Sequence, residues 1–227
     1  MFYVLIYKYN IIFLKKPNKN KSKIDNSVFN YMARKKETRK LREPLPTVIG
    51  AGITEKWYFR HLKNLEHLKL EVKPKYFGSD TAYDMQKLVE GVLSMGGKAI
   101  CVFDMDTTQW DEVEKERKER FMEEYCKNPD VILCESMPSI EYWFLLHFEK
   151  TNRYFKSSDR VIDVLEQYMP YEKTEKFLSQ PQWFTHLVSN NRCKQAMRNA
   201  EELGELGASY TKIPKAVQFL IEKQKNA

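Results

Sequence analysis

The sequence has few cysteines, and none stands at the spacing of a metal or redox site. Its four cysteines form no Cys-x-x-Cys pair, which excludes a zinc ribbon and a thioredoxin-type motif. Cys101 and Cys134 lie inside apolar runs that are typical of strands. We therefore expect buried, unpaired thiols and a protein of the reducing cytoplasm.

The chain also lacks a long, uninterrupted apolar run. Its start, MFYVLIYKYNIIFLKK, is apolar but short, contains Lys8 and has no small-residue cleavage site, which excludes a membrane-spanning helix and a clean signal peptide. The Lys/Asn-rich residues 17–31 are typical of disorder. The following MARKK looks like a natural protein start, so we predict that Met32 is the initiator and that residues 1–31 are a translated leader. The alternative is a membrane-surface anchor of aromatics and lysines.

The folded part of the chain lacks a strong charge of either sign. The net charge is +7, but residues 1–46 hold 12 Lys/Arg against 3 Asp/Glu, a net of +9, and the rest carries −2. The basic excess is therefore a property of the N-terminal segment. Any nucleic-acid surface on the body has to be a local patch.

Apolar strand-like runs alternate with helical patterns from residue 47 to about residue 150. Four strands are expected, near residues 47–50, 68–78, 98–104 and 130–136. This alternation predicts an α/β fold with a parallel sheet flanked by helices. No convincing strand follows residue 150, where three helices are expected, near residues 159–169, 190–203 and 213–224.

These patterns divide the chain into three parts. Residues 1–46 are predicted to form a basic, disordered segment, and residues 47–150 an α/β domain. Residues 151–227 are predicted to form a helical C-terminal portion packed on that domain.

Acidic residues follow three of the expected strands. Glu55 follows the first, Asp104 and Asp106 the third, and Glu141 the fourth, and sites in parallel sheets form at the carboxyl ends of strands. Residues two apart in an extended segment point the same way, so the aspartates can present both carboxylates to one ion. Oxygen ligands without His or Cys suit Mg²⁺ or Mn²⁺ held partly by water and substrate phosphate. The structural alternative is one aspartate that caps the next helix and one that is merely exposed.

Three segments resemble the RloB family in order and spacing: VIGAGITEKWYFRHL, VFDMDTT and ESMPSIEYWFLLHF. The resemblance covers about residues 32–225. The third segment is the most specific, because it matches the family pattern S-x-P-x-x-E-x-W-x-x-x-H at Ser136, Pro138, Glu141, Trp143 and His147. RloB proteins resemble Toprim domains and are encoded beside restriction and ATPase genes in bacterial phage-defence loci. The resemblance implies a Toprim-like sheet and a nuclease that acts with an ATPase partner.

The first segment departs from the family. The family pattern is C-E-G-E-x-T-E-x-x-Y-F, and this chain has Gly50 and Gly52 where the two earlier glutamates would stand. In Toprim enzymes, a glutamate near the end of the first strand is the proposed acid/base group or metal ligand. Three options follow: Glu55 takes over, Glu141 completes the site, or the protein is a non-catalytic relative.

The stretch DMDTT also resembles the D-x-D-x-[TV] nucleophile motif of haloacid-dehalogenase-like phosphatases. In that family the motif usually stands on the first strand, whereas two β-α units precede it here. The family also needs a later lysine and a strand-borne acidic pair. Asp159 and Asp163 have the acidic spacing, but no apolar strand precedes them.

Five further residues are candidates for site roles. His147 lies in an apolar helical run, where packing is the alternative to a catalytic role. Lys173 resembles a downstream basic position of the family that could meet a phosphate. Lys194 and Arg198 are four apart and share a helical face that can contact a nucleic-acid backbone. Arg192 belongs to the same basic segment and points elsewhere.

Together with what the resemblance implies, these features predict a Mg²⁺- or Mn²⁺-dependent phosphodiesterase that acts on DNA or RNA in phage defence under the control of an ATPase partner. Asp104 and Asp106 are the expected metal ligands. Glu55 and Glu141 are expected as further ligands or acid/base groups. The alternative is a degenerate Toprim-like module that binds nucleic acid or a partner without cleaving.

Overall fold

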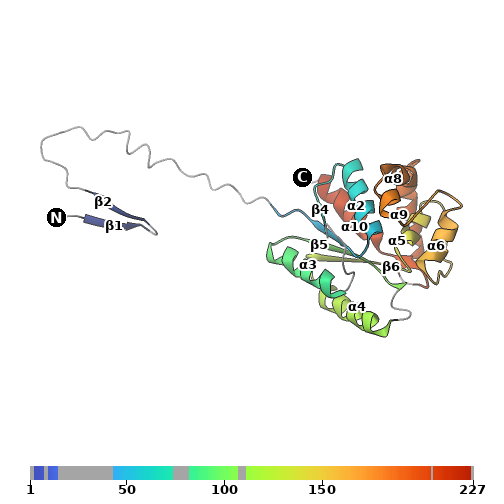
Figure 1. Ribbon diagram of the computed structural model, residues 1–227, viewed down its shortest axis with the longest axis horizontal. Coiled ribbons are helices and arrows are strands. Elements are labelled where there is room, and N and C mark those ends of the chain that lie inside the picture. The colour runs from blue at the N-terminus through green and yellow to red at the C-terminus, as the bar shows by residue number, and fades with distance from the viewer. Residues whose placement is uncertain are drawn as a thin grey trace. The chain divides into compact units, whose positions relative to one another are not determined.

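The computed structural model describes residues 3–7, 10–14, 43–73, 82–106, 111–205 and 207–225. The chain forms two units, Met1–Arg42 and Glu43–Ala227 (Figure 1).

The first unit contains a hairpin where the sequence predicts disorder. Strands β1 (Tyr3–Tyr7) and β2 (Asn10–Leu14) pair antiparallel. Both are rich in β-branched and aromatic residues, which favour strands, and this explains the difference. Residues 15–42 lie outside the described residues.

The second unit is built on a five-stranded sheet in the order β4-β3-β5-β6-β7. The first four of these strands run parallel, and β7 is antiparallel to β6. This confirms the α/β class. The bounds are β3 (Thr47–Gly50), β4 (Glu71–Lys73), β5 (Ala99–Asp104), β6 (Val131–Met137) and β7 (Tyr210–Thr211).

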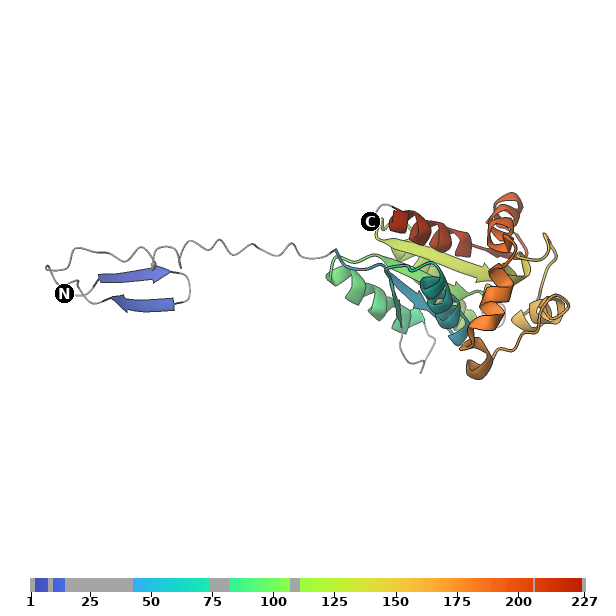
Figure 2. The same ribbon diagram turned by 90° about the horizontal axis from the view of Figure 1, so that it is seen from above.

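Helices cover both faces of the sheet (Figures 1 and 2). On β5, Ile100 and Val102 face one apolar core, whereas Cys101 and Phe103 face the other. α3 (Ala82–Ser94) and α4 (Glu112–Tyr125) cover the Cys101 face, and the remaining helices gather on the opposite face. These are α2 (Ile53–Leu65), α5 (Ile140–Leu145), α6 (Ser158–Leu165), α7 (Glu175–Leu178), α8 (Pro181–Val188), α9 (Arg192–Leu203) and α10 (Ile213–Lys225).

The C-terminal portion differs from the predicted three helices, because it also contains α7, α8 and a short strand. It contributes β7, which pairs with the end of β6, and the hydroxyls of Ser136 and Thr211 lie 2.7 Å apart across this pair. A two-residue strand is too short to show an alternating pattern, so periodicity does not reveal it. α10 follows directly and packs along β6 (Figure 2).

The thiols of Cys101 and Cys134 are buried and unpaired, as predicted. Among the described residues, no helix has the length and apolar character needed to cross a membrane.

Candidate active site

Three parallel strands end at one edge of the sheet, and a carboxylate follows each of them. Asp104 is the last residue of β5. Glu55 lies in the first turn of α2, which follows β3, and Glu141 lies in the first turn of α5, which follows β6. The carboxyl ends of parallel strands are where sites form in such sheets. We call Glu55, Asp104 and Glu141 the carboxylate cluster.

Glu141 is fully buried and is held by four side chains. Its Oε2 accepts a hydrogen bond of 2.6 Å from the Ser139 hydroxyl. Its Oε1 accepts from the Tyr171 hydroxyl at 3.0 Å and from the Thr54 hydroxyl at 3.4 Å, and lies 3.3 Å from Nζ of Lys173. Both oxygens are therefore engaged by the protein, and the side chain is fixed in place.

Glu55 is buried, but its Oε2 has no hydrogen-bond partner. The carboxylate fills the space beside the two glycines that precede α2. A Cβ on Gly52 would lie 2.8 Å from Oε2 of Glu55, and a Cβ on Gly50 would lie 2.8 Å from its Cβ. Glu55 thus occupies the place into which side chains at positions 50 and 52 would extend.

Asp104 joins β5 to the start of α5. Its Oδ1 accepts a hydrogen bond of 2.9 Å from the backbone N–H of Ile140, and its carbonyl oxygen accepts one of 2.6 Å from Nζ of Lys118. Burial, followed by the charges of Glu55 and Glu141, raises the pKa of Asp104 well above its usual range. The aspartate therefore does cap a helix, but that helix is α5, since Asp111 caps α4.

Asp106 stands at the margin of the carboxylate cluster. β5 ends at Asp104, and the backbone N–H of Asp106 donates to the carbonyl of Pro138 at 3.0 Å in the turn that follows. The alternation expected of an extended segment therefore does not extend to this residue. Within the described part of the chain, no three His, Cys, Asp or Glu side chains are arranged to hold a metal ion.

Lys173 supplies a positive charge beside Glu141. Burial disfavours its ammonium, but Glu141, Asp104 and Glu55 outweigh that effect and raise its pKa above the usual range. Its side chain is 41 % exposed, so the ammonium lies between buried carboxylates and solvent. Lys173 is thus a counter-ion of the cluster, and its exposure also leaves it accessible to a phosphate.

His147 is not brought together with the carboxylate cluster by any described contact. Its Nδ1 lies 2.9 Å from the Trp143 carbonyl, and the two rings pack edge to face at 4.6 Å. Burial lowers the pKa of His147 to about 4, so the ring is neutral at pH 7. These contacts favour a packing role.

The three basic residues of α9 differ in their surroundings. Arg192 donates to the His186 carbonyl at 2.7 Å and lies over the Phe148 ring at 4.7 Å. Lys194 is exposed, and Arg198 is bonded within its own helix. No described contact links this helix face to the carboxylate cluster.

Sequence patterns missed the residues that fix the cluster. Thr54, Ser139 and Tyr171 bind Glu141 through hydroxyls that carry no charge signal. Lys118 lies in the charged helix α4, whose composition is typical of a solvated surface, yet it is 9 % exposed. Lys118 stands three residues before the buried Phe121, which places both on one side of the helix. This spacing was the pattern that could have indicated its burial.

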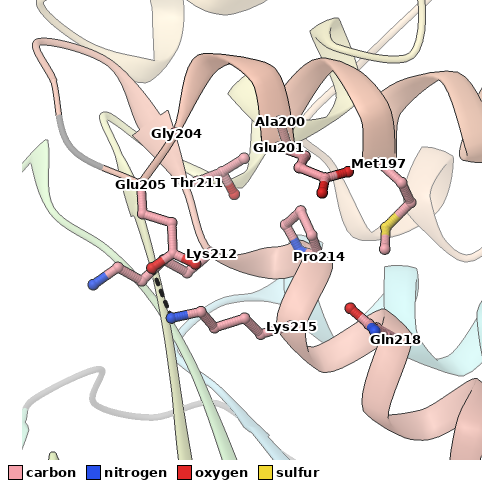
Figure 3. Close-up of a pocket in the computed structure, with 10 residues that line it drawn as sticks. All are labelled: Met197, Ala200, Glu201, Gly204, Glu205, Thr211, Lys212, Pro214, Lys215 and Gln218. Carbon is pink, nitrogen blue, oxygen red and sulfur yellow. Dashed lines mark hydrogen bonds and ion pairs between the residues drawn. The ribbon is translucent and has the colours of Figure 1, made fainter.

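A separate cavity of about 360 Å³ lies between α9, β7 and α10 (Figure 3). Among its lining residues, Lys215 pairs with Glu205 at 2.7 Å, and Lys212 pairs with the buried Glu135. Both lysines are thus engaged with carboxylates, and we assign no site to this cavity.

The titration of Glu55 yields a stability prediction. Burial, with a contribution from Glu141, raises the pKa of Glu55 from 4.5 to about 7. Since the folded state binds this proton more tightly, its stabilisation is complete below pH 4.5 and is lost as the pH rises to about 7. We expect a loss of about 2 kcal/mol between pH 5 and pH 7. Urea unfolding of the parent and of Glu55→Gln across this range measures the difference, and parallel curves would contradict the assignment.

The sequence of this chain matches a protein-family model. The model of the family described as RloB-like protein matches residues 47–220. This chain belongs to the RloB-like family. No curated protein and no solved structure matched the chain.

All the residues of the candidate site lie within the match to the RloB-like family. This includes the carboxylate cluster, Asp106 and Lys173. Gly50 and Gly52, which depart from the family pattern, also lie within the match. In this RloB-like chain, the side chain of Glu55 lies beside these two glycines.

Proposed function

We propose that this RloB-like protein is a divalent-metal-dependent phosphodiesterase that cleaves nucleic acid. The observation that carries the proposal is the unpartnered, buried Oε2 of Glu55 in a cluster with Asp104 and Glu141. A buried carboxylate oxygen without a hydrogen-bond donor destabilises the fold if its role is only structural. Such an oxygen is suited to bind a metal ion that arrives with the substrate.

The donor chemistry fits Mg²⁺ or Mn²⁺. Mg²⁺ is commonly held by one or two carboxylates, with water and substrate phosphate completing its shell, so a set of three acidic ligands is not required. Asp104 and Glu55 would hold the ion, with Asp106 beside them, because both oxygens of Glu141 are engaged. When bound, such an ion stabilises charge on a phosphoryl group and lowers the pKa of water.

The chain's own residues supply the remaining functions. Lys173 carries a positive charge at the exposed side of the cluster and can orient a phosphate there. In the alternative in which Glu55 does not hold the ion, its pKa near 7 allows it to exchange a proton at neutral pH. Resemblance to defence-locus proteins supports a role in phage defence in the cytoplasm, under control of an ATPase partner.

The test replaces Asp104→Asn together with Asp106→Asn. Asparagine keeps an oxygen that can accept the bond from Ile140, so the fold is preserved while the charge is lost. We expect the parent to cleave labelled DNA or RNA in the presence of Mg²⁺ or Mn²⁺. Cleavage should stop when EDTA removes the metal ion. The variant should be slower by about 100-fold or more. Metal should raise the melting temperature of the parent only.

The matched control is Asp159→Asn with Asp163→Asn, two exposed aspartates of α6, and it should cleave like the parent. Hydrolysis of a phosphomonoester by the parent, and its loss in the control variant, would favour the phosphatase interpretation, although these residues lie on a helix. A strongly destabilised Asp104/Asp106 variant, with a parent that ignores metal, would assign the pair to helix capping and end the nuclease proposal.

A binding module without cleavage is the second candidate. The ion pair between Lys173 and Glu141 favours it, because a protein cation already neutralises part of the cluster. Metal-independent binding of nucleic acid by a parent that never cleaves would support this candidate.

A further inference from the structure

A basic groove of about 710 Å³ lies between α2, the edge strand β4 and the start of α7. α2 contributes three cations at spacings of four and three residues, which places them on one side of the helix. β4 contributes one more. The basic groove is defined by Lys56, Arg60, Lys63 and Lys73.

The groove keeps a net positive charge after its ion pairs are counted. Lys56 pairs with Glu175 at 3.1 Å, and Lys73 lies 3.6 Å from Glu71. Among the residues that the structure describes, Arg60 and Lys63 form no salt bridge. The Lys63 ammonium donates to a backbone carbonyl at 2.8 Å, and the Arg60 guanidinium lies over the Trp57 ring at 5.1 Å.

The basic groove adjoins the carboxylate cluster on two sides. Lys56 directly follows Glu55 in the first turn of α2. Its ion-pair partner, Glu175, stands two residues after Lys173, which binds Glu141. The contact between α2 and α7 therefore marks the end of the groove that lies next to the cluster. A chain lying in the groove would pass close to these carboxylates.

We propose that the basic groove binds the phosphate backbone of a nucleic-acid strand and leads it to the carboxylate cluster. The inference rests on the proposed function for the reaction, but the binding stands on its own charges. Among the described residues that line the groove, Val72 is the one apolar side chain and none is aromatic. Recognition is thus by phosphate charge and independent of base sequence.

The test compares two pairs of neutral substitutions. Arg60→Gln with Lys63→Gln removes the two groove cations that form no salt bridge. Arg117→Gln with Arg120→Gln removes two exposed cations, also three apart, from α4 on the opposite face of the sheet. Binding of fluorescent 12-nucleotide single-stranded DNA and RNA of mixed sequence is measured by anisotropy in EDTA, where metal-dependent cleavage does not occur.

We expect the groove variant to bind at least about tenfold more weakly at 0.1 M salt. The slope of log affinity against log salt should fall by about 1.4 in magnitude, because each phosphate contact on a single strand contributes about 0.7. The α4 variant should keep both values. If the paired variant does not fold, Arg60→Gln alone should lower the slope by about 0.7.

Equal weakening of both variants, an unchanged slope in the groove variant, or a parent that binds no oligonucleotide would each overturn the proposal. So would displacement of the strand by polyglutamate at equal charge concentration, since that would indicate a general polyanion site. These outcomes are independent of the nuclease test, which changes Asp104 and Asp106 and measures cleavage.

Discussion

Replacing Glu141 by alanine is expected to cause the largest loss of stability in this chain. Three hydroxyl groups and one ammonium converge on its carboxylate, which is fully buried. Removing one partner of a buried charged network costs about 3–5 kcal/mol, because the other groups stay unpaired. For a chain of this size, the melting temperature should fall by about 10 °C.

Urea unfolding measures this loss, and Glu149→Ala is the matched control. Glu149 also binds a cation, Arg153, and a tyrosine hydroxyl, Tyr168, at 2.6 Å each. Its side chain is 27 % exposed, so its removal should cost about 1 kcal/mol or less. Glu141→Gln keeps an acceptor for the hydroxyls and should lie between the two. If Glu141→Ala costs no more than the control, the network does not stabilise the fold.

The contacts of Glu141 also explain why the site forms only in the complete fold. Thr54 comes from α2, Ser139 from the turn before α5, and Tyr171 and Lys173 from the segment before α7. The carboxylate therefore ties the helical C-terminal portion to the edge of the sheet. Loss of Glu141 should disturb the position of Lys173 as well as stability.

The central strands and their carboxylates were predictable because each leaves a local pattern. Continuous apolar runs mark β5 and β6, and Asp104 and Glu141 directly follow them or lie within a few residues. The strand order β4-β3-β5-β6-β7 leaves no such pattern, because it depends on contacts between distant segments. Tyr171 reaches Glu141 across 30 residues, and nothing in its immediate neighbours indicates that contact.

The relation of Asp104 to Asp106 shows a second limit of sequence patterns. The expectation that both point the same way assumes an extended chain through residue 106. Whether the strand continues is decided by hydrogen bonds to the next segment. The N–H groups of Met105 and Asp106 both donate to the carbonyl of Pro138, which draws the chain into a turn. The position of the Pro138 carbonyl cannot be deduced from the sequence around Asp106.

Gly50→Ala is expected to destabilise the protein by about 3 kcal/mol, whereas Gly52→Ala should cost much less. The added Cβ at position 50 would lie 2.8 Å from Cβ of Glu55 and 3.6 Å from the backbone nitrogen of Lys56. These atoms are fixed by α2, so the helix itself has to shift. At position 52 the nearest atom is Oε2 of Glu55, the free end of a side chain that can rotate away. The φ of Gly52 is −138°, which any residue adopts.

A double-mutant cycle with Glu55→Gly tests the cause. Removing the side chain of Glu55 should cancel most of the cost of Gly50→Ala, with a coupling energy of about 1–3 kcal/mol from urea unfolding. Additive costs would show that the glycine serves another purpose. Cancellation would show that the side chain of Glu55 is what excludes a side chain at position 50. A Gly52→Glu chain should then fold, because only a rotating carboxylate stands in its way.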